Sequence, residues 1–127
     1  MIEYNKYCKE LGLTKKDFPF NELSKRETIE EKMSVMTWNL DKTLLIEMYC
    51  YFRALRDQKI GFPICLEKEG GSEKWNEILD TILEGIKAKY QSDFWGDWDD
   101  KKKYARADRK FKKSMKLMYE WWDAFWW

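Results

Sequence analysis

The stretch from Ser72 to Tyr90 constrains the fold more than any other part of the chain. Its large apolar residues recur at intervals of three and four positions: Trp75, Ile78, Leu79, Ile82, Leu83, Ile86 and Tyr90. Because one α-helical turn takes 3.6 residues, these side chains form one continuous face. The pattern predicts a helix over 73–90 with this face buried against other segments.

Two further long helices are predicted to cover that face. One spans 40–58 and is ended by Gly61 and Pro63. The residues expected on its core side are Leu40, Leu44, Met48, Tyr51, Phe52 and Leu55. The other spans 98–125, with three carboxylates near its start. These are Asp97, Asp99 and Asp100, which we interpret as capping residues, the alternative being part of a magnesium site.

Shorter helices are predicted before residue 40. The first carries Tyr4, Tyr7, Cys8 and Leu11 on one face and ends at Gly12. The second begins at a capping box formed by Ser24 and Glu27 and runs to about Met36. Only six Gly and two Pro are present, too few for a turn-rich β protein. The predicted fold class is all-α: a compact bundle of about four to five helices in a single domain, residues 1–127.

The residue inventory excludes several kinds of active site. The chain has no His, so Ser-His-Asp and Cys-His sites are impossible, and it has no glycine-rich phosphate-loop motif. Its three cysteines, Cys8, Cys50 and Cys65, lack CxxC spacing and fit neither a disulfide framework nor a zinc site. We therefore expect a cytosolic, non-enzymatic protein with no metal, no cofactor, no signal peptide and no membrane span.

Positive charge is concentrated in the last predicted helix. Residues 101–116 contain nine bases and one acid, a net charge of +8, while the whole chain carries +1. One helical face carries Lys102, Arg106, Arg109, Lys113 and Lys116. Such a stripe attracts the phosphates of a nucleotide or a nucleic acid. The alternative is a solvated face neutralised by the acidic remainder of the chain or of a second subunit.

A second candidate lies on the 40–58 helix, opposite its predicted apolar stripe. Tyr49, Arg53 and Arg56 place one aromatic ring and two guanidinium groups on one side. Such a set can stack on a base and clamp a phosphate or a carboxylate. Simple solvent exposure is the alternative. Together with Lys102, Arg106, Arg109 and Lys113, these residues form the predicted ligand-binding site.

Aromatic residues make up 17% of the chain, with eight Trp, and many lie near the C-terminus. Tyr104, Phe111, Met118 and Phe125 repeat every seven residues, as in a left-handed helix pair. The C-terminal segment adds Trp121, Trp122, Trp126 and Trp127. So much apolar surface is expected to be buried, either in the core or in a subunit interface. We expect a homo-oligomer, most simply a dimer, with Phe111, Met118 and the four Trp in the interface.

The segment from Thr37 to Leu45, TWNLDKTLL, resembles the opening of a family of small bacteriophage accessory proteins, which begins TWSLD. The family continues through a basic helix to a GYP turn, matched here by GFP at 61–63. A WxxILD helix and a closing LWW follow, matched by WNEILD at 75–80 and FWW at 125–127. The resemblance covers residues 37–127, leaves residues 1–36 outside, and implies a phage origin. Such accessory proteins often disarm host defence.

These observations lead to a functional hypothesis with two alternatives. The chain is expected to sequester a small nucleotide-type anion in an aromatic and basic pocket, without turning it over. The first alternative is a protein-binding inhibitor of a host defence protein that uses the C-terminal Trp cluster. The second is a nucleic-acid binder that uses the basic last helix.

Overall fold

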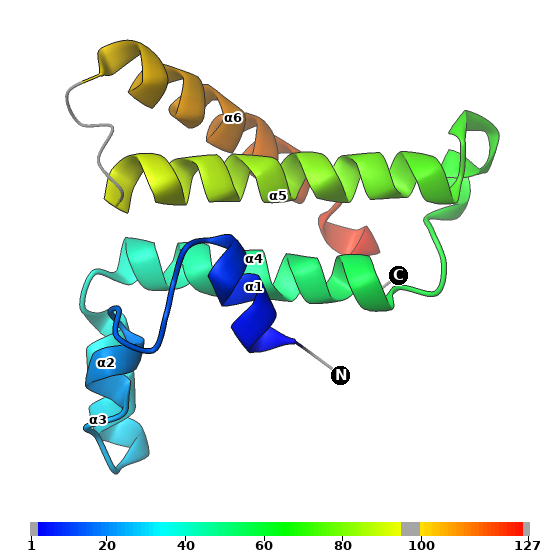
Figure 1. The fold of residues 1–127 in the computed structure, drawn as a ribbon. Coiled ribbons are helices and arrows are strands. Elements are labelled where there is room, and N and C mark those ends of the chain that lie inside the picture. Colours follow the sequence, from blue (N-terminus) through cyan, green and yellow to red (C-terminus); the bar gives the residue numbers. More distant parts are fainter. Residues whose placement is uncertain (1–2, 95–99, 126–127) are drawn as a thin grey trace.

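The computed structural model describes residues 3–94 and 100–125, and every regular element within those ranges is helical (Figure 1). Three long helices dominate: α4 (Leu40–Gln58), α5 (Ser72–Phe94) and α6 (Lys101–Glu120). Each runs opposite to the one before it, and α5 lies between the other two. The predicted all-α bundle is confirmed.

The central helix α5 follows the prediction closely. All seven residues of its apolar stripe are buried, and Trp75 at 0% exposure packs among the rings of the C-terminal segment. The helix continues to Phe94, about one turn beyond the predicted end. The stripe therefore forms the spine of the core, as its unbroken helical period indicated.

The last helix is shorter than predicted. It begins at Lys101, where the Asp100 side chain accepts hydrogen bonds from the backbone N–H groups of Lys102 and Lys103. The capping role of Asp100 is confirmed, while Asp97, Trp98 and Asp99 lie outside the described residues. After Glu120 the backbone leaves the α-conformation, and a short turn, η3 (Trp122–Ala124), follows.

This turn explains why the sequence pattern overestimated the length of α6. It lets Phe125 fold back until its ring centroid lies 4.8 Å from that of Phe52 and 6.0 Å from that of Trp75. A straight helix would carry Phe125 past the end of the core.

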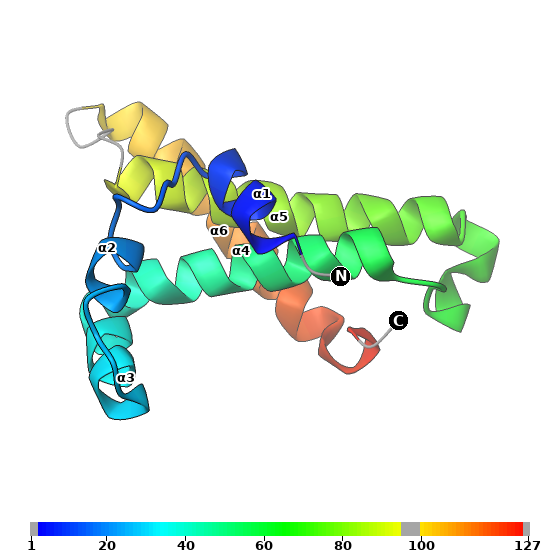
Figure 2. The ribbon, with the colours of Figure 1, turned by 60° about the horizontal axis from the view of Figure 1, so that its bottom comes forward.

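The N-terminal segment contains α1 (Tyr4–Glu10), α2 (Phe20–Leu23) and α3 (Ile29–Thr37). Gly12, with φ of 88°, lies just after the end of α1, as predicted. The predicted capping box at Ser24 is wrong, because Thr28 caps α3 by accepting from the Glu31 backbone N–H. In the turned view, α1 lies across α4, and α2 and α3 extend from the N-terminal end of α4 (Figure 2).

The predicted core face of α4 is only partly right: Met48, Phe52 and Leu55 pack against the edge of the core, but the main buried face is another one. The residues that pack inward are Thr43, Leu45, Ile46, Tyr49, Cys50 and Ala54. Leu44 and Tyr51 from the predicted stripe are instead 50% and 59% exposed. The helix is apolar on two opposite sides, and contacts with α1 and α5 decide which side is buried. The predicted stripe without Phe52, which packs on Phe125, is called here the outer seam of α4: Leu40, Leu44, Met48, Tyr51 and Leu55. Its members Leu40, Leu44 and Tyr51 are about half exposed, and Met48 and Leu55 are half-buried at the edge of the core.

Close contact between α5 and α6 depends on Gly85. The hydroxyl of Ser114 on α6 lies 2.9 Å from the carbonyl oxygen of Ile82 and 3.2 Å from that of Thr81. A Cβ at position 85 would overlap Ser114 Oγ and the Lys110 carbonyl oxygen. The two backbones can approach this closely only because residue 85 has no side chain.

The connector between α4 and α5 contains a 3-10 helix, η1 (Ile64–Glu69), where the sequence showed no regular pattern. Trp38, which precedes α4, is 46% exposed, and the Arg26 guanidinium lies 5.5 Å from its ring centroid. Among the helices that the structure describes, none is long and apolar enough to cross a bilayer.

Candidate functional site

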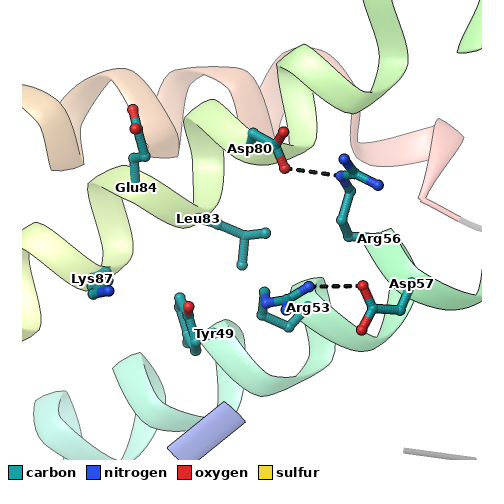
Figure 3. Close-up of a pocket in the computed structure, with 8 residues that line it drawn as sticks. All are labelled: Tyr49, Arg53, Arg56, Asp57, Asp80, Leu83, Glu84 and Lys87. Atoms are coloured by element: carbon teal, nitrogen blue, oxygen red, sulfur yellow. Dashed lines mark hydrogen bonds and ion pairs between the residues drawn. The ribbon is translucent and has the colours of Figure 1, made fainter. Parts of the chain in front are cut away.

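A polar pocket of about 560 Å³ opens between α4 and α5 (Figure 3). Four of its residues follow one face of α4: Tyr49, Arg53, Arg56 and Asp57. The facing side of α5 contributes Asp80, Leu83, Glu84 and Lys87. Both sets recur at helical intervals of three and four, so two straight helix faces form the opposite walls. The structure thus brings together the three residues of α4 that the sequence singled out.

Arg53 is held between two carboxylates of the protein through all three of its nitrogens. Its Nε and Nη2 donate to the two carboxylate oxygens of Glu10 at 2.8 and 3.0 Å, and its Nη1 donates to Asp57 at 2.8 Å. The Tyr49 hydroxyl donates to the same Glu10 carboxylate at 2.8 Å. The guanidinium also lies 4.9 Å from the centroid of the Tyr7 ring. Arg53 therefore ties α1 to α4.

The pKa shifts in this network follow from its hydrogen bonds. The bond from Arg53 lowers the pKa of Glu10, outweighing the opposite effect of burial. Burial alone would raise the pKa of Asp57, but the bonds from Tyr7 and Arg53 lower it. Burial, with the bond to Asp57, raises the pKa of Tyr7 to about 12. The network is thus held as ion pairs at neutral pH.

Among the described residues, Arg56 and Lys87 are the pocket cations with the most donor capacity left. Arg56 donates from Nε to Asp80 at 2.9 Å, and its terminal nitrogens have no hydrogen-bond partner among the described residues. Lys87 has no ion pair within the same part of the chain. Three basic and three acidic residues line the pocket, so its formal charge balances. It suits a small polar ligand that carries charges of both signs.

The other predicted ligand residues lie elsewhere. Lys102, Arg106, Arg109 and Lys113 are exposed on α6, and none of them lines the pocket. Tyr49 is buried instead of facing outward, because α4 is turned so that this side meets α1 and α5. Its ring is therefore not open for stacking on a base. Within the described ranges, no cluster of three or more metal-ligating side chains is present.

A second hollow, of about 650 Å³ and mainly apolar, lies between α4 and the C-terminal end of α6. We call it the apolar groove. It is lined by Met48, Tyr51, Phe52, Leu55, Met118, Trp122, Asp123 and Phe125. Sequence reasoning assigned its α4 residues to the core, so the groove was missed; the signal for it was the second apolar face of α4.

The predicted interface residues divide between core and surface. Met118 is buried, Phe111 is half-buried, and Trp121 packs on Trp75 with ring centroids 5.6 Å apart. Trp122 is 68% exposed at the groove. Trp126 and Trp127 lie outside the described residues. Of the described members, Trp122 alone presents most of its side chain to solvent.

Several partners in the polar network could not be found from sequence. The Arg53–Asp57 pair has the i, i+4 spacing of a helical ion pair, which can be recognised in the sequence. Glu10 and Asp80 reach their arginines across large sequence separations, which no local pattern encodes.

Comparison with known proteins adds nothing to this geometry: no protein-family model, curated protein or solved structure matches the chain.

Proposed function

We propose that this chain is a non-catalytic binding protein that holds an amphipathic helix of a partner protein in the apolar groove. The observation that carries the proposal is the outer seam of α4. The inner face of that helix already fills the core, yet Leu40, Leu44 and Tyr51 are each about half exposed on the opposite side. A contiguous apolar surface of this kind marks an interaction site.

The shape of the site favours a helical ligand. Leu44, Met48, Tyr51 and Leu55 follow a 4-3-4 spacing, which is the seam of a helix pair. The opposite wall is formed by Met118 near the end of α6 and Trp122 of η3. Methionine and aromatic side chains adapt to an inserted apolar face and supply most of the binding energy of such grooves.

Charge next to the seam defines the partner further. At 100° per residue, Asp41 and Glu47 flank the seam on its two sides. Asp41 is exposed, and Glu47 is half-buried and accepts a hydrogen bond from the Tyr4 hydroxyl at 3.5 Å. The complementary helix has an apolar seam bordered by Lys or Arg. The resemblance to phage accessory proteins supports a host defence protein in the bacterial cytosol as its source.

Synthetic helical peptides of about 20 residues test this proposal by calorimetry. The probe has a leucine seam with lysine flanks, and its counterpart has glutamate flanks. We expect the lysine peptide to bind at least about tenfold more tightly, since like charges repel the other. Tyr51→Glu should abolish binding, whereas Ile60→Glu, at a fully exposed apolar residue outside the groove, should leave it unchanged.

Equal binding of both peptides, or equal loss in the Tyr51 and Ile60 variants, would contradict the proposal. The homodimer predicted from the sequence competes for the same surface, and light scattering of the full chain separates the two. A wild-type dimer that Tyr51→Glu converts to a monomer, with no peptide binding, would assign the groove to a second copy.

The small nucleotide-type ligand predicted from the sequence is the second candidate, located in the polar pocket. The observation that favours it is the unused donor capacity of Arg56 beside Lys87. Titration with mono-, di- and cyclic nucleotides should give binding that Arg56→Gln weakens. Lys74→Gln, which removes a charge elsewhere on α5, is the control. Heat that is absent, or unaffected by Arg56→Gln, would leave the groove as the sole candidate.

A further inference from the structure

The basic face of α6 is defined here as Lys102, Arg106, Arg109, Lys113 and Lys116. All five side chains are exposed. None of them forms an ion pair with a carboxylate in the described part of the chain. Neutralisation by the chain's own acids, the alternative raised by the sequence, is therefore not what the described residues show.

Two of the acids of this helix region, Asp100 and Asp108, are engaged away from the basic face, whereas Glu120 lies on the face at its C-terminal end. Asp108 accepts from Lys112 at 3.1 Å and lies 3.6 Å from Lys89 of α5. Those hydrogen bonds and charges lower the pKa of Asp108, the bond from Lys112 most of all. Asp100 is occupied as the N-terminal cap, and Glu120 marks the C-terminal end of the face. The positive charge consequently stands unopposed along most of the helix.

The arrangement of the five bases is regular. They follow a 4-3-4-3 spacing, so they extend for about 21 Å along one side of the helix at 1.5 Å per residue. The buried side of α6, with Ala107, Ser114 and Met118, is held against α5 and the core. The packing thus fixes the basic face toward solvent.

We propose that the basic face of α6 binds double-stranded nucleic acid through its phosphate backbone. Duplex DNA carries one negative charge per about 1.7 Å of axis, so a straight row of five cations can neutralise about five phosphates. No aromatic residue is interleaved among the five bases. At 100° per residue, Tyr104 and Tyr119 project from other sides of α6. Single-strand binders stack bases on aromatic rings within the basic path, so the duplex is favoured.

A membrane surface fits this face less well. An interfacial helix must insert an apolar side next to its basic side, and the apolar side of α6 is largely committed to the core.

The proposed contact with the duplex does not depend on its base sequence, because lysine and arginine on phosphates position a protein without reading base edges. Nucleic-acid binding by the basic face is independent of helix binding in the apolar groove, because the two surfaces share no residue.

Fluorescence anisotropy with a labelled duplex of about 20 base pairs tests the proposal through its salt dependence. Five phosphate contacts give a slope of log affinity against log salt of about −4.5. Affinity should therefore fall about 500-fold between about 50 and 200 mM salt. A single strand of the same length should bind more weakly.

Variants of equal net charge identify the face. Arg109→Gln with Lys113→Gln removes two cations from the basic face and should reduce the slope to about −2.7. Lys112→Gln with Lys25→Gln removes two cations that are already paired, with Asp108 and Glu22, and should keep the full slope. Circular dichroism checks that all variants remain helical.

The inference is overturned by no binding at about 50 mM salt, where electrostatic contacts are strongest. It is equally overturned if the control pair weakens binding as much as the Arg109 and Lys113 pair, or if the single strand binds more tightly. Equal competition by polyglutamate of matched charge would replace nucleic acid by acidic protein as the partner.

Discussion

Replacing Gly85 by alanine separates helix propensity from helix packing, because the two predict opposite signs. Alanine in a helix interior is favoured over glycine by about 1 kcal/mol, so propensity alone predicts a more stable protein. The structure predicts the reverse. The new Cβ would overlap Ser114 Oγ and the Lys110 carbonyl oxygen, and would lie 2.8 Å from Ser114 Cβ.

The size of the effect follows from what can move. The Ser114 hydroxyl can rotate, at the loss of a buried hydrogen bond worth about 1 kcal/mol. The Lys110 carbonyl belongs to the helix backbone and cannot, so α5 and α6 must separate. Overpacking of this kind costs about 1–3 kcal/mol. After the propensity gain of about 1 kcal/mol, we expect a net loss of about 1–3 kcal/mol.

Urea unfolding followed by circular dichroism measures this change, with Glu84→Ala, at the exposed neighbouring position, as the control. The Gly85→Ala change should cost less when it is made in the Ser114→Gly variant than when it is made in the wild type. The reason is that Ser114→Gly removes two of the three atoms that the new Cβ would meet. An increase in stability for Gly85→Ala, or strict additivity in the double variant, would refute the close approach of α5 and α6.

Three further predictions concern the core, the polar network and a helix cap. Trp75→Ala should lower the free energy of unfolding by about 3–5 kcal/mol, because the ring is fully buried against Trp121; wild-type thermal unfolding would show that it is not. Glu10→Gln should cost about 1–3 kcal/mol at neutral pH by leaving Arg53 partly unpaired. Since the folded pKa of Glu10 is lowered, its contribution is full above the unfolded value of about 4.3 and is lost as pH falls through the folded pKa. Wild type and variant should therefore converge as acid protonates Glu10, and a difference of constant size down to the lowest pH at which the protein stays folded would contradict the ion pair. Thr28→Ala should cost about 1 kcal/mol in the same urea assay, whereas Ser24→Ala, at the capping position predicted from sequence, should be close to neutral.

Sequence periodicity located the main helices because local geometry determines it. The stripe from Trp75 to Tyr90 and the bounds of α4 required no knowledge of neighbouring segments. Charge distribution along α6 was equally local, so its basic face could be defined before the structure. The grouping of Tyr49, Arg53 and Arg56 on one side of α4 also followed from the helical interval alone.

The use made of each face was decided only by the tertiary structure. Helix α4 is apolar on two sides, and a period of 3.6 residues cannot tell which side meets the core; contacts with α1 and α5 choose the side of Tyr49 and leave Leu44 outside. Glu10 reaches Arg53 from another helix, so a predicted clamp for external phosphate became an internal ion pair. In the sequence, Gly85 is only a residue of low helix propensity inside a predicted helix. The close approach of Ser114 in the folded protein shows why no side chain fits at this position. In each case a local pattern fixes the direction of a side chain relative to its own helix, whereas its partner depends on how the helices pack.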